Sequence, residues 1–307
     1  MPSLRDHGHQ TVLVKRLPRS SRWFFLFALA GASLQCSSDN LTLPVEGVPA
    51  NIDVVSGDDQ RAEVGTPLAD SLIVAVTDSK DRPVADTLVA FVLVGANAGT
   101  DFVPDTARTD LNGLARSRWI LGHTMGAQDV EARVVASTLK AVFHATGDPG
   151  PAATLTEIKG DQQTGEVGTA LADSLVVKVT DQFGNPVSGL SVAWSALGGG
   201  TVSAATVNTG ANGQAAVQRV LGNTAGPQTA EADAAGLNGS PLIFTHRATA
   251  GSATTMVKDP VTDGQFGLVG TELTDSIVVI VKDANGNGVA GRSVLWTIAT
   301  GGGTVNP

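Results

Sequence analysis

An internal repeat of about one hundred residues constrains this chain more than any other feature. The octet VGTPLADS at residues 64–71 returns as VGTALADS at 167–174 and as VGTELTDS at 269–276, at offsets of 103 and 102 residues. Solenoid and propeller repeats are about 20–50 residues long and cannot stand alone, whereas about one hundred residues is enough for a self-sufficient domain. The sequence therefore predicts a tandem array of small domains.

We place the copies at residues 48–148, 149–250 and 251–307. The two connections between copies are short and partly stiffened by proline, which predicts limited hinge freedom. The last residues align with the middle of copy two, so we expect the third copy to contain only the N-terminal half of a domain. Half a sandwich would leave strand edges unpaired and Trp296 uncovered, and we interpret the sequence as a fragment of a longer reading frame.

Within each copy, apolar and polar residues alternate with a period of two, which is typical of half-buried strands. Leu175, Val177 and Val179 follow this pattern, and turn-forming residues at 181–186 and 283–288 separate the strands. We find no amphipathic helical stretch longer than a couple of turns after residue 40. Short strands with turns every 8 to 12 residues predict an all-β fold of antiparallel, Greek-key, immunoglobulin-like β-sandwiches.

One aromatic residue occupies the same place in every copy, namely Phe91, Trp194 and Trp296. Its neighbours two positions away are apolar, so we predict that it fills the core between two sheets. The alternative is a platform on which a sugar could stack.

The first forty residues have the pattern of an export signal. A basic opening is followed by ten apolar residues, 23–32, which are too few to cross a bilayer as a helix. We predict a signal peptide at 1–35, helical or disordered, and a polar tether at 36–47. The alternative is a buried N-terminal helix.

Cys36, the single cysteine, excludes an internal disulfide. Its place after the signal resembles a bacterial lipoprotein, a resemblance that implies lipidation of Cys36 and a membrane anchor. Ser33, Leu34 and Gln35 depart from the usual lipoprotein box. The alternative is cleavage after Ala32 and soluble secretion with a free thiol.

The middle copy carries a series of short motifs, at Gly168–Ser174, Val177–Asp181, Gly184–Val187, Val192–Trp194, Gly198–Val202, Asn212–Ala215 and Leu221–Gln228. This series resembles the bacterial immunoglobulin-like group 1 domain of the intimin/invasin family. Copy one departs from the pattern at 80–83 and 97–100. Over about 260 residues, the resemblance implies adhesion or surface presentation. The middle copy carries every element of the pattern.

Sites that could carry chemistry are weak in this sequence. The run 283–288 echoes a calcium loop but has Val294 where the bidentate glutamate belongs. The triple glycines at 198–200 and 301–303 precede strands, so we interpret them as turns rather than phosphate loops. Asp58, Asp59 and Asp161 are interpreted as solvated loop charges. We predict no enzymatic activity, cofactor, metal site or small-molecule substrate.

We predict an exported protein of the bacterial envelope, at the outer membrane or cell surface, whose domains form a semi-rigid stalk with an adhesive or structural role toward a protein or glycan ligand. The alternative is a spacer that carries a C-terminal enzyme or carbohydrate-binding domain. Beyond residue 35 the chain has 15 basic and 28 acidic residues. Such an acidic chain repels phosphate backbones and disfavours nucleic acid as a partner.

Overall fold

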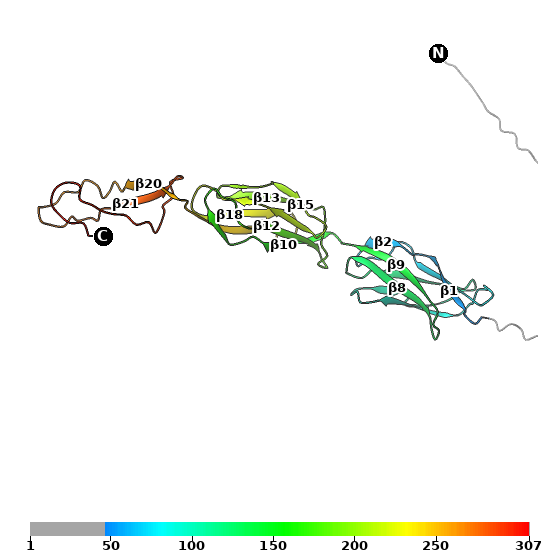
Figure 1. The fold of residues 1–307 in the computed structure, drawn as a ribbon. Helices are drawn as coiled ribbons and strands as arrows, with labels where there is room; N and C mark the ends of the chain where they lie inside the picture. The colour runs from blue at the N-terminus through cyan, green and yellow to red at the C-terminus, as the bar shows by residue number, and fades with distance from the viewer. Residues whose placement is uncertain (1–46, 307) are drawn as a thin grey trace, which may run out of the picture. The chain divides into compact units, whose positions relative to one another are not determined.

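The computed structural model describes residues 47–306, and the predicted signal peptide, Cys36 and most of the tether lie outside this range. Every regular element in it is a β-strand, which confirms the predicted all-β fold (Figure 1). Between residues 47 and 306 no helix is long and apolar enough to cross a membrane.

The strands fall into two sandwiches and a C-terminal hairpin, and no sheet mixes strands from two of these groups. The first sandwich contains β1 (Asn51–Ser56), β2 (Gln60–Glu63), β3 (Leu72–Thr77), β4 (Leu88–Val94), β5 (Asp101–Val103), β6 (Thr106–Arg108), β7 (Leu114–Ile120), β8 (Gly126–Val134) and β9 (Lys140–Asp148). The second contains β10 (Ala152–Lys159), β11 (Gln163–Glu166), β12 (Leu175–Asp181), β13 (Ser191–Leu197), β14 (Thr201–Val202), β15 (Thr206–Asn208), β16 (Gln214–Val217), β17 (Arg219–Val220), β18 (Gly226–Asp233) and β19 (Leu242–Thr249).

Both sandwiches have the same sheet topology. The first pairs a sheet of order β1-β3-β7-β5 with a sheet of order β2-β9-β8-β4-β6. The second has β10-β12-β16 opposite β11-β19-β18-β13-β15, and a short β14-β17 ladder completes it. The hundred-residue repeat of the sequence is therefore a repeat of strand order.

Each sandwich contains one parallel strand pair, β2 with β9 and β11 with β19, which the prediction of antiparallel sheets did not include. The cause is a bend between the first two strands of each sandwich, at which the chain crosses from one sheet to the other. Gly160 makes this bend in the second sandwich with a φ of +112°. A Cβ at Gly160 would lie 2.7 Å from the carbonyl oxygen of Ser174, so the crossing requires glycine.

Each sandwich has its own apolar core between the two sheets. In the second, Leu175, Val177 and Val179 of β12 are fully buried, as their alternation predicts. Trp194 and Phe244 face each other in this core with ring centroids 5.9 Å apart. Phe91 lies in the core of the first sandwich.

The C-terminal segment forms one antiparallel pair, β20 (Ala253–Lys258) with β21 (Val279–Asp283). The expected strand around Trp296 is not formed. In the second sandwich, the equivalent strand β13 is held by β15 and β18, and these strands have no counterpart within residues 251–306. Without ladder partners, this segment has no hydrogen bonds to hold it extended.

Candidate functional site at the junctions between copies

The β12 end of the second sandwich carries a tightly bonded acidic loop. Both oxygens of Asp181, which is 2% exposed, accept hydrogen bonds. Oδ1 accepts from the backbone N–H groups of Phe183 and Asn185, each at 2.9 Å. Oδ2 accepts from the backbone N–H of Gly150, at 2.9 Å, and from Asn185 Nδ2, at 2.8 Å. The carboxylate thus ties the loop to the connection between the two sandwiches.

Asn185 also bonds to the first sandwich. Its Nδ2 donates to the carbonyl oxygen of His123 at 2.8 Å, and its Oδ1 accepts from the backbone N–H of Met125 at 3.0 Å. Asn185 is 7% exposed, so both bonds are shielded from water. One side chain therefore links the second sandwich to the turn of residues 122–125 in the first.

That turn is held in shape by a buried glutamine. Gln128 Oε1 accepts from the backbone N–H of Gly122 at 2.8 Å, and Gln128 Nε2 donates to the carbonyl oxygen of Thr124 at 3.0 Å. Gln228 makes the same two bonds in the second sandwich, with Gly222 and Thr224, both at 2.8 Å. We call residues 122–125 and 222–225 the docking turns.

The next junction repeats the arrangement. Asn287 Nδ2 donates to the carbonyl oxygen of Asn223 at 2.9 Å, and Asn287 Oδ1 accepts from the backbone N–H of Ala225 at 2.9 Å. Asp283 takes the role of Asp181, and its Oδ2 accepts from the backbone N–H of Gly251 at 2.9 Å. The same atoms therefore make the same bonds at both junctions.

The two junctions differ in one aromatic contact. The ring of Phe183 stacks on that of His123, with centroids 3.9 Å apart and an angle of 12° between the ring planes. At the second junction, Asn285 and Asn223 occupy these two positions. The first junction therefore contains apolar and stacking contacts in addition to the hydrogen bonds.

In the first sandwich the same loop closes on itself. Asp78 corresponds to Asp181, and Arg82 stands where the second sandwich has Asn185. The Arg82 guanidinium bonds Asp78 Oδ2 through Nε at 2.8 Å and through Nη2 at 2.6 Å.

Hydrogen bonds keep all three loop carboxylates ionised. The Arg82 guanidinium lowers the pKa of Asp78 to about 2, and the Asn287 amide lowers the pKa of Asp283 to about 2. Burial alone would raise the pKa of Asp181, but bonds from Asn185, Gly150 and Phe183 outweigh it and lower the pKa below its ordinary value.

The sequence predicts these loops as turns but does not predict their bonds across the junctions. Asn185 and Asn287 each follow an aspartate by four residues, and the first sandwich breaks this spacing with Arg82. That contrast is visible in the sequence, but the bonded partner of each asparagine is not.

The structure places the three predicted core aromatics differently. Phe91 and Trp194 are 3% and 4% exposed. Trp296 is half-buried and belongs to neither core.

Two of the three aspartates and one of the two glycine turns considered for chemistry take part in bonds within the sandwiches. Asp58 Oδ1 accepts from the backbone N–H of His144 at 2.7 Å, and Asp161 accepts from the equivalent N–H of Thr245. The glycine turn at 198–200 supplies the Gly199 carbonyl oxygen, which accepts from Arg219 Nη2 at 2.6 Å. No group of three metal-binding side chains occurs within residues 47–306.

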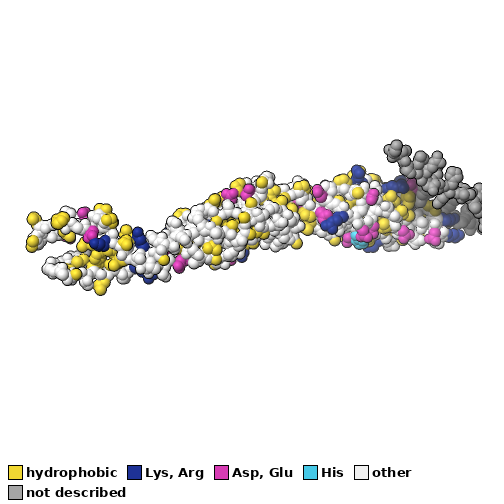
Figure 2. Space-filling view, turned by 90° about the horizontal axis from the view of Figure 1, so that it is seen from above, with side chains coloured by type: hydrophobic (Ala, Val, Ile, Leu, Met, Phe, Trp, Pro, Cys, Tyr) yellow, Lys and Arg dark blue, Asp and Glu magenta, His cyan; other side chains and the backbone are white. Residues whose placement is uncertain are grey.

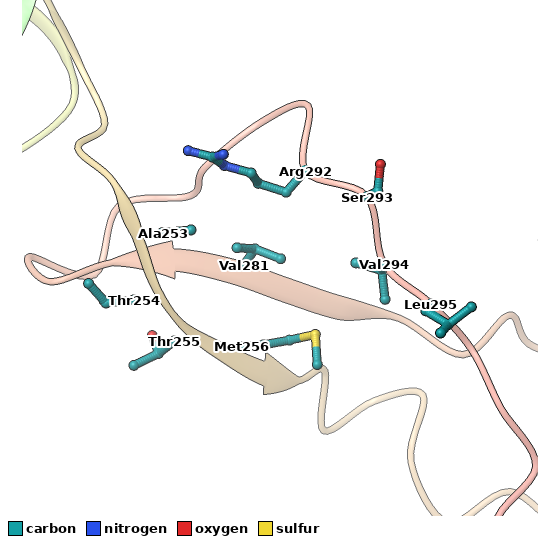
Figure 3. Close-up of a pocket in the computed structure, with 9 residues that line it drawn as sticks. All are labelled: Ala253, Thr254, Thr255, Met256, Val281, Arg292, Ser293, Val294 and Leu295. Atoms are coloured by element: carbon teal, nitrogen blue, oxygen red, sulfur yellow. The ribbon is translucent and has the colours of Figure 1, made fainter.

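A hollow of about 420 Å³ lies beside the β20–β21 hairpin (Figure 3). Met256, Val281 and Leu295 line its apolar part and Arg292 its edge. Apolar side chains gather on the surface of this segment (Figure 2), where Phe266 is 98% exposed and Leu295 is 88% exposed. These residues belong to the third copy, of which the described residues 251–306 form only the β20–β21 pair.

The second sandwich matches a known family. Residues 169–246 match the family model of the bacterial Ig-like domain (group 1). No curated protein matches the chain. Solved structures that are similar to this chain at low identity include FdeC, invasin and InvD. The Escherichia coli adhesin FdeC shares 22% identity over 78% of this chain and 75% of its own, with a TM-score of 0.49.

Invasin, a bacterial integrin-binding protein, shares 20% identity over 80% of this chain and 49% of its own, with a TM-score of 0.39. InvD of Yersinia pseudotuberculosis shares 16% identity over 75% of this chain and 69% of its own, with a TM-score of 0.45. This chain therefore spans about half of the invasin structure.

Proposed function

We propose that this protein is an exported adhesion or structural protein of the bacterial envelope, in which consecutive Ig-like copies form a semi-rigid stalk. The observation that carries the stalk is the repeated junction, where Asn185 and Asn287 bond to the docking turn of the preceding copy. Short connections leave little slack between copies, and the hydrogen bonds of the two asparagines oppose their reorientation.

The adhesive role rests on the resemblance of the repeat to intimin/invasin-type Ig-like domains and on the family match at 169–246. We expect a protein or glycan ligand on another cell. The acidic surface keeps neighbouring stalks apart and makes nucleic acid a poor partner.

Attachment tests the adhesive role directly. A non-adherent bacterium that displays the full chain is compared with the same strain that does not display it. We expect the intact chain to raise attachment to cultured host cells or to sister cells several-fold. If surface-exposed protein gives no attachment, adhesion is wrong and only the spacer role, with or without a further domain, is left.

Anchoring at Cys36 is part of the proposal and has its own test. Labelled palmitate is expected to enter the wild-type chain and not the Cys36→Ser variant. Labelling of neither would contradict the lipid anchor and favour soluble secretion, and equal labelling of both would contradict lipidation at Cys36.

A further inference from the structure

Each docking turn offers a matched pair of backbone groups to the next copy. In the first turn these are the carbonyl oxygen of His123 and the N–H of Met125, and in the second they are the carbonyl oxygen of Asn223 and the N–H of Ala225. The turn thus presents one hydrogen-bond acceptor and one donor, side by side, and Gln128 or Gln228 holds it in that shape.

A carboxamide side chain satisfies both at once. It carries one acceptor oxygen and one donor nitrogen, whereas a guanidinium has only donors and an ionised carboxylate only acceptors. Asn185 uses its second Nδ2 proton on Asp181, so the aspartate orients the amide toward the turn. Asn287 is oriented by Asp283 in the same way, at 2.8 Å.

Arg82 cannot make this contact. A guanidinium in place of the amide could donate to a carbonyl oxygen but would leave the N–H of the turn without an acceptor. Both Arg82 nitrogens that bond Asp78 are instead directed into their own loop. The loop keeps its internal fold, and the group that would bind a docking turn is missing.

We propose that the residue four positions after the loop aspartate decides whether an Ig-like copy docks onto a copy in front of it. Asparagine makes the loop a ligand for the docking turn of the preceding copy, and arginine makes the loop self-contained. The first sandwich is therefore built to receive a following copy through residues 122–125 and not to dock onto a preceding one. This inference rests on the proposed semi-rigid stalk and assigns its specificity to one side chain.

The test replaces Asn185 by the residue that the first sandwich uses. Asn185→Arg is expected to retain a bond to Asp181, as Arg82 bonds Asp78, and to lose the contacts with the docking turn. Asn208→Arg is the matched control, because it adds the same charge at an exposed position of the second sandwich whose side chain makes no hydrogen bond with the turn. Urea unfolding of each variant checks that both sandwiches remain folded.

Spin labels at exposed positions 106 and 195, in a full chain that also carries Cys36→Ser, report the distance between the two sandwiches by pulsed electron resonance. We expect a narrow distance distribution for the wild type and Asn208→Arg, and a broad one for Asn185→Arg. Loss of two hydrogen bonds is expected to lower the ratio of docked to undocked molecules by roughly thirtyfold. Asn185→Asp keeps a hydrogen-bond acceptor and loses the donor, and we expect it to broaden the distance distribution as well.

The outcomes separate the proposed semi-rigid stalk from the proposed control of docking by Asn185. If the wild type is narrow and Asn185→Arg is equally narrow, the asparagine does not control docking and the inference is wrong, while the stalk stands. If the wild type is already broad, the copies are not held together, and the stalk and the inference both fail.

Discussion

Trp119 in the first sandwich and Arg219 in the second occupy equivalent positions one hundred residues apart, and both side chains are fully buried. A second pair of equivalent positions changes with them. Ala145 and His246 each pair with the buried glutamine of their sandwich, and each is 4% exposed. The same fold therefore contains an apolar pair in one copy and two basic groups in the other.

Backbone carbonyl oxygens accept hydrogen bonds from both terminal nitrogens of the Arg219 guanidinium. Nη1 donates to the Val220 carbonyl oxygen and Nη2 to that of Gly199, both at 2.6 Å. Its Nε and the Nδ1 of His246 are buried without a hydrogen-bond partner. A buried cation bonded to carbonyl oxygens stabilises less than its desolvation costs unless every donor is used, so this part of the core is sensitive to change.

Arg219 and His246 can be replaced by the Trp and Ala that the first sandwich has at these positions. We expect the effects of the two replacements on stability to be strongly coupled. Arg219→Trp and His246→Ala should each destabilise the second sandwich, because each leaves the other residue in surroundings that do not fit it. The double variant should be more stable than the sum of the single effects predicts, by about 1 kcal/mol or more. Urea unfolding of the four proteins measures the coupling, and strictly additive effects would contradict it.

Mild acid is expected to destabilise the second sandwich through His246. Burial lowers the pKa of His246, and the Arg219 charge lowers it further, against the opposing Gly160 carbonyl and Asp161. Between this lowered pKa and about 6.5, only the unfolded chain takes up the proton, so stability is complete above about pH 6.5 and falls below it. Hydrogen exchange of β18 and β19 at pH 7.5, 6.5 and 5.5 measures this loss.

His246→Ala is the control for that experiment, and its pH dependence should be flatter. The first sandwich supplies a second comparison, because the hydrogen bond with Asp129 raises the pKa of His144. That group contributes stability below about pH 6.5 and loses it as the pH rises through its folded value. The contribution is small because His144 is largely exposed, so equal acid sensitivity of both sandwiches would contradict the assignment to His246.

Alanine at Gly160 is expected to cost more than alanine at Gly189, although both glycines have positive φ. A Cβ at Gly189, with φ +77°, would meet nothing within 4 Å, so only the left-handed backbone penalty of about 1 kcal/mol applies. At Gly160 the Cβ would also collide with the Ser174 carbonyl, and we expect about 3 kcal/mol. Urea unfolding of the two variants compares them, and equal losses would show that the sheet crossing tolerates a side chain.

Truncation of the repeated aromatic is expected to have unequal effects. Trp194→Ala should cost about 3–5 kcal/mol, because the ring fills a closed core against Phe244. Trp296→Ala should cost less than about 1 kcal/mol in this chain, because that ring is half-buried and has no sheet opposite it. Thermal unfolding measures both, and a large loss at Trp296 would indicate a packed third copy.

The predictions made from sequence succeeded where the signal was local. The alternation of Leu175, Val177 and Val179 with polar neighbours indicated one buried strand face, and these residues are buried. The aspartate loops were identified as turns, and their backbone N–H groups do bond the Asp181 and Asp283 carboxylates. The bond from Asn185 to His123 spans 62 residues, and no local pattern indicates its partner.

By itself, the amino-acid sequence determined the repeat, the all-β class and the turns, because these depend on spacing and on the conformations that single residues allow. The tertiary structure alone decided which strands cross between sheets, that Arg219 is buried and that Asn185 binds the preceding copy. Those outcomes depend on which groups meet after folding, where burial gives a hydrogen bond or a charge an importance that it does not have in the unfolded chain.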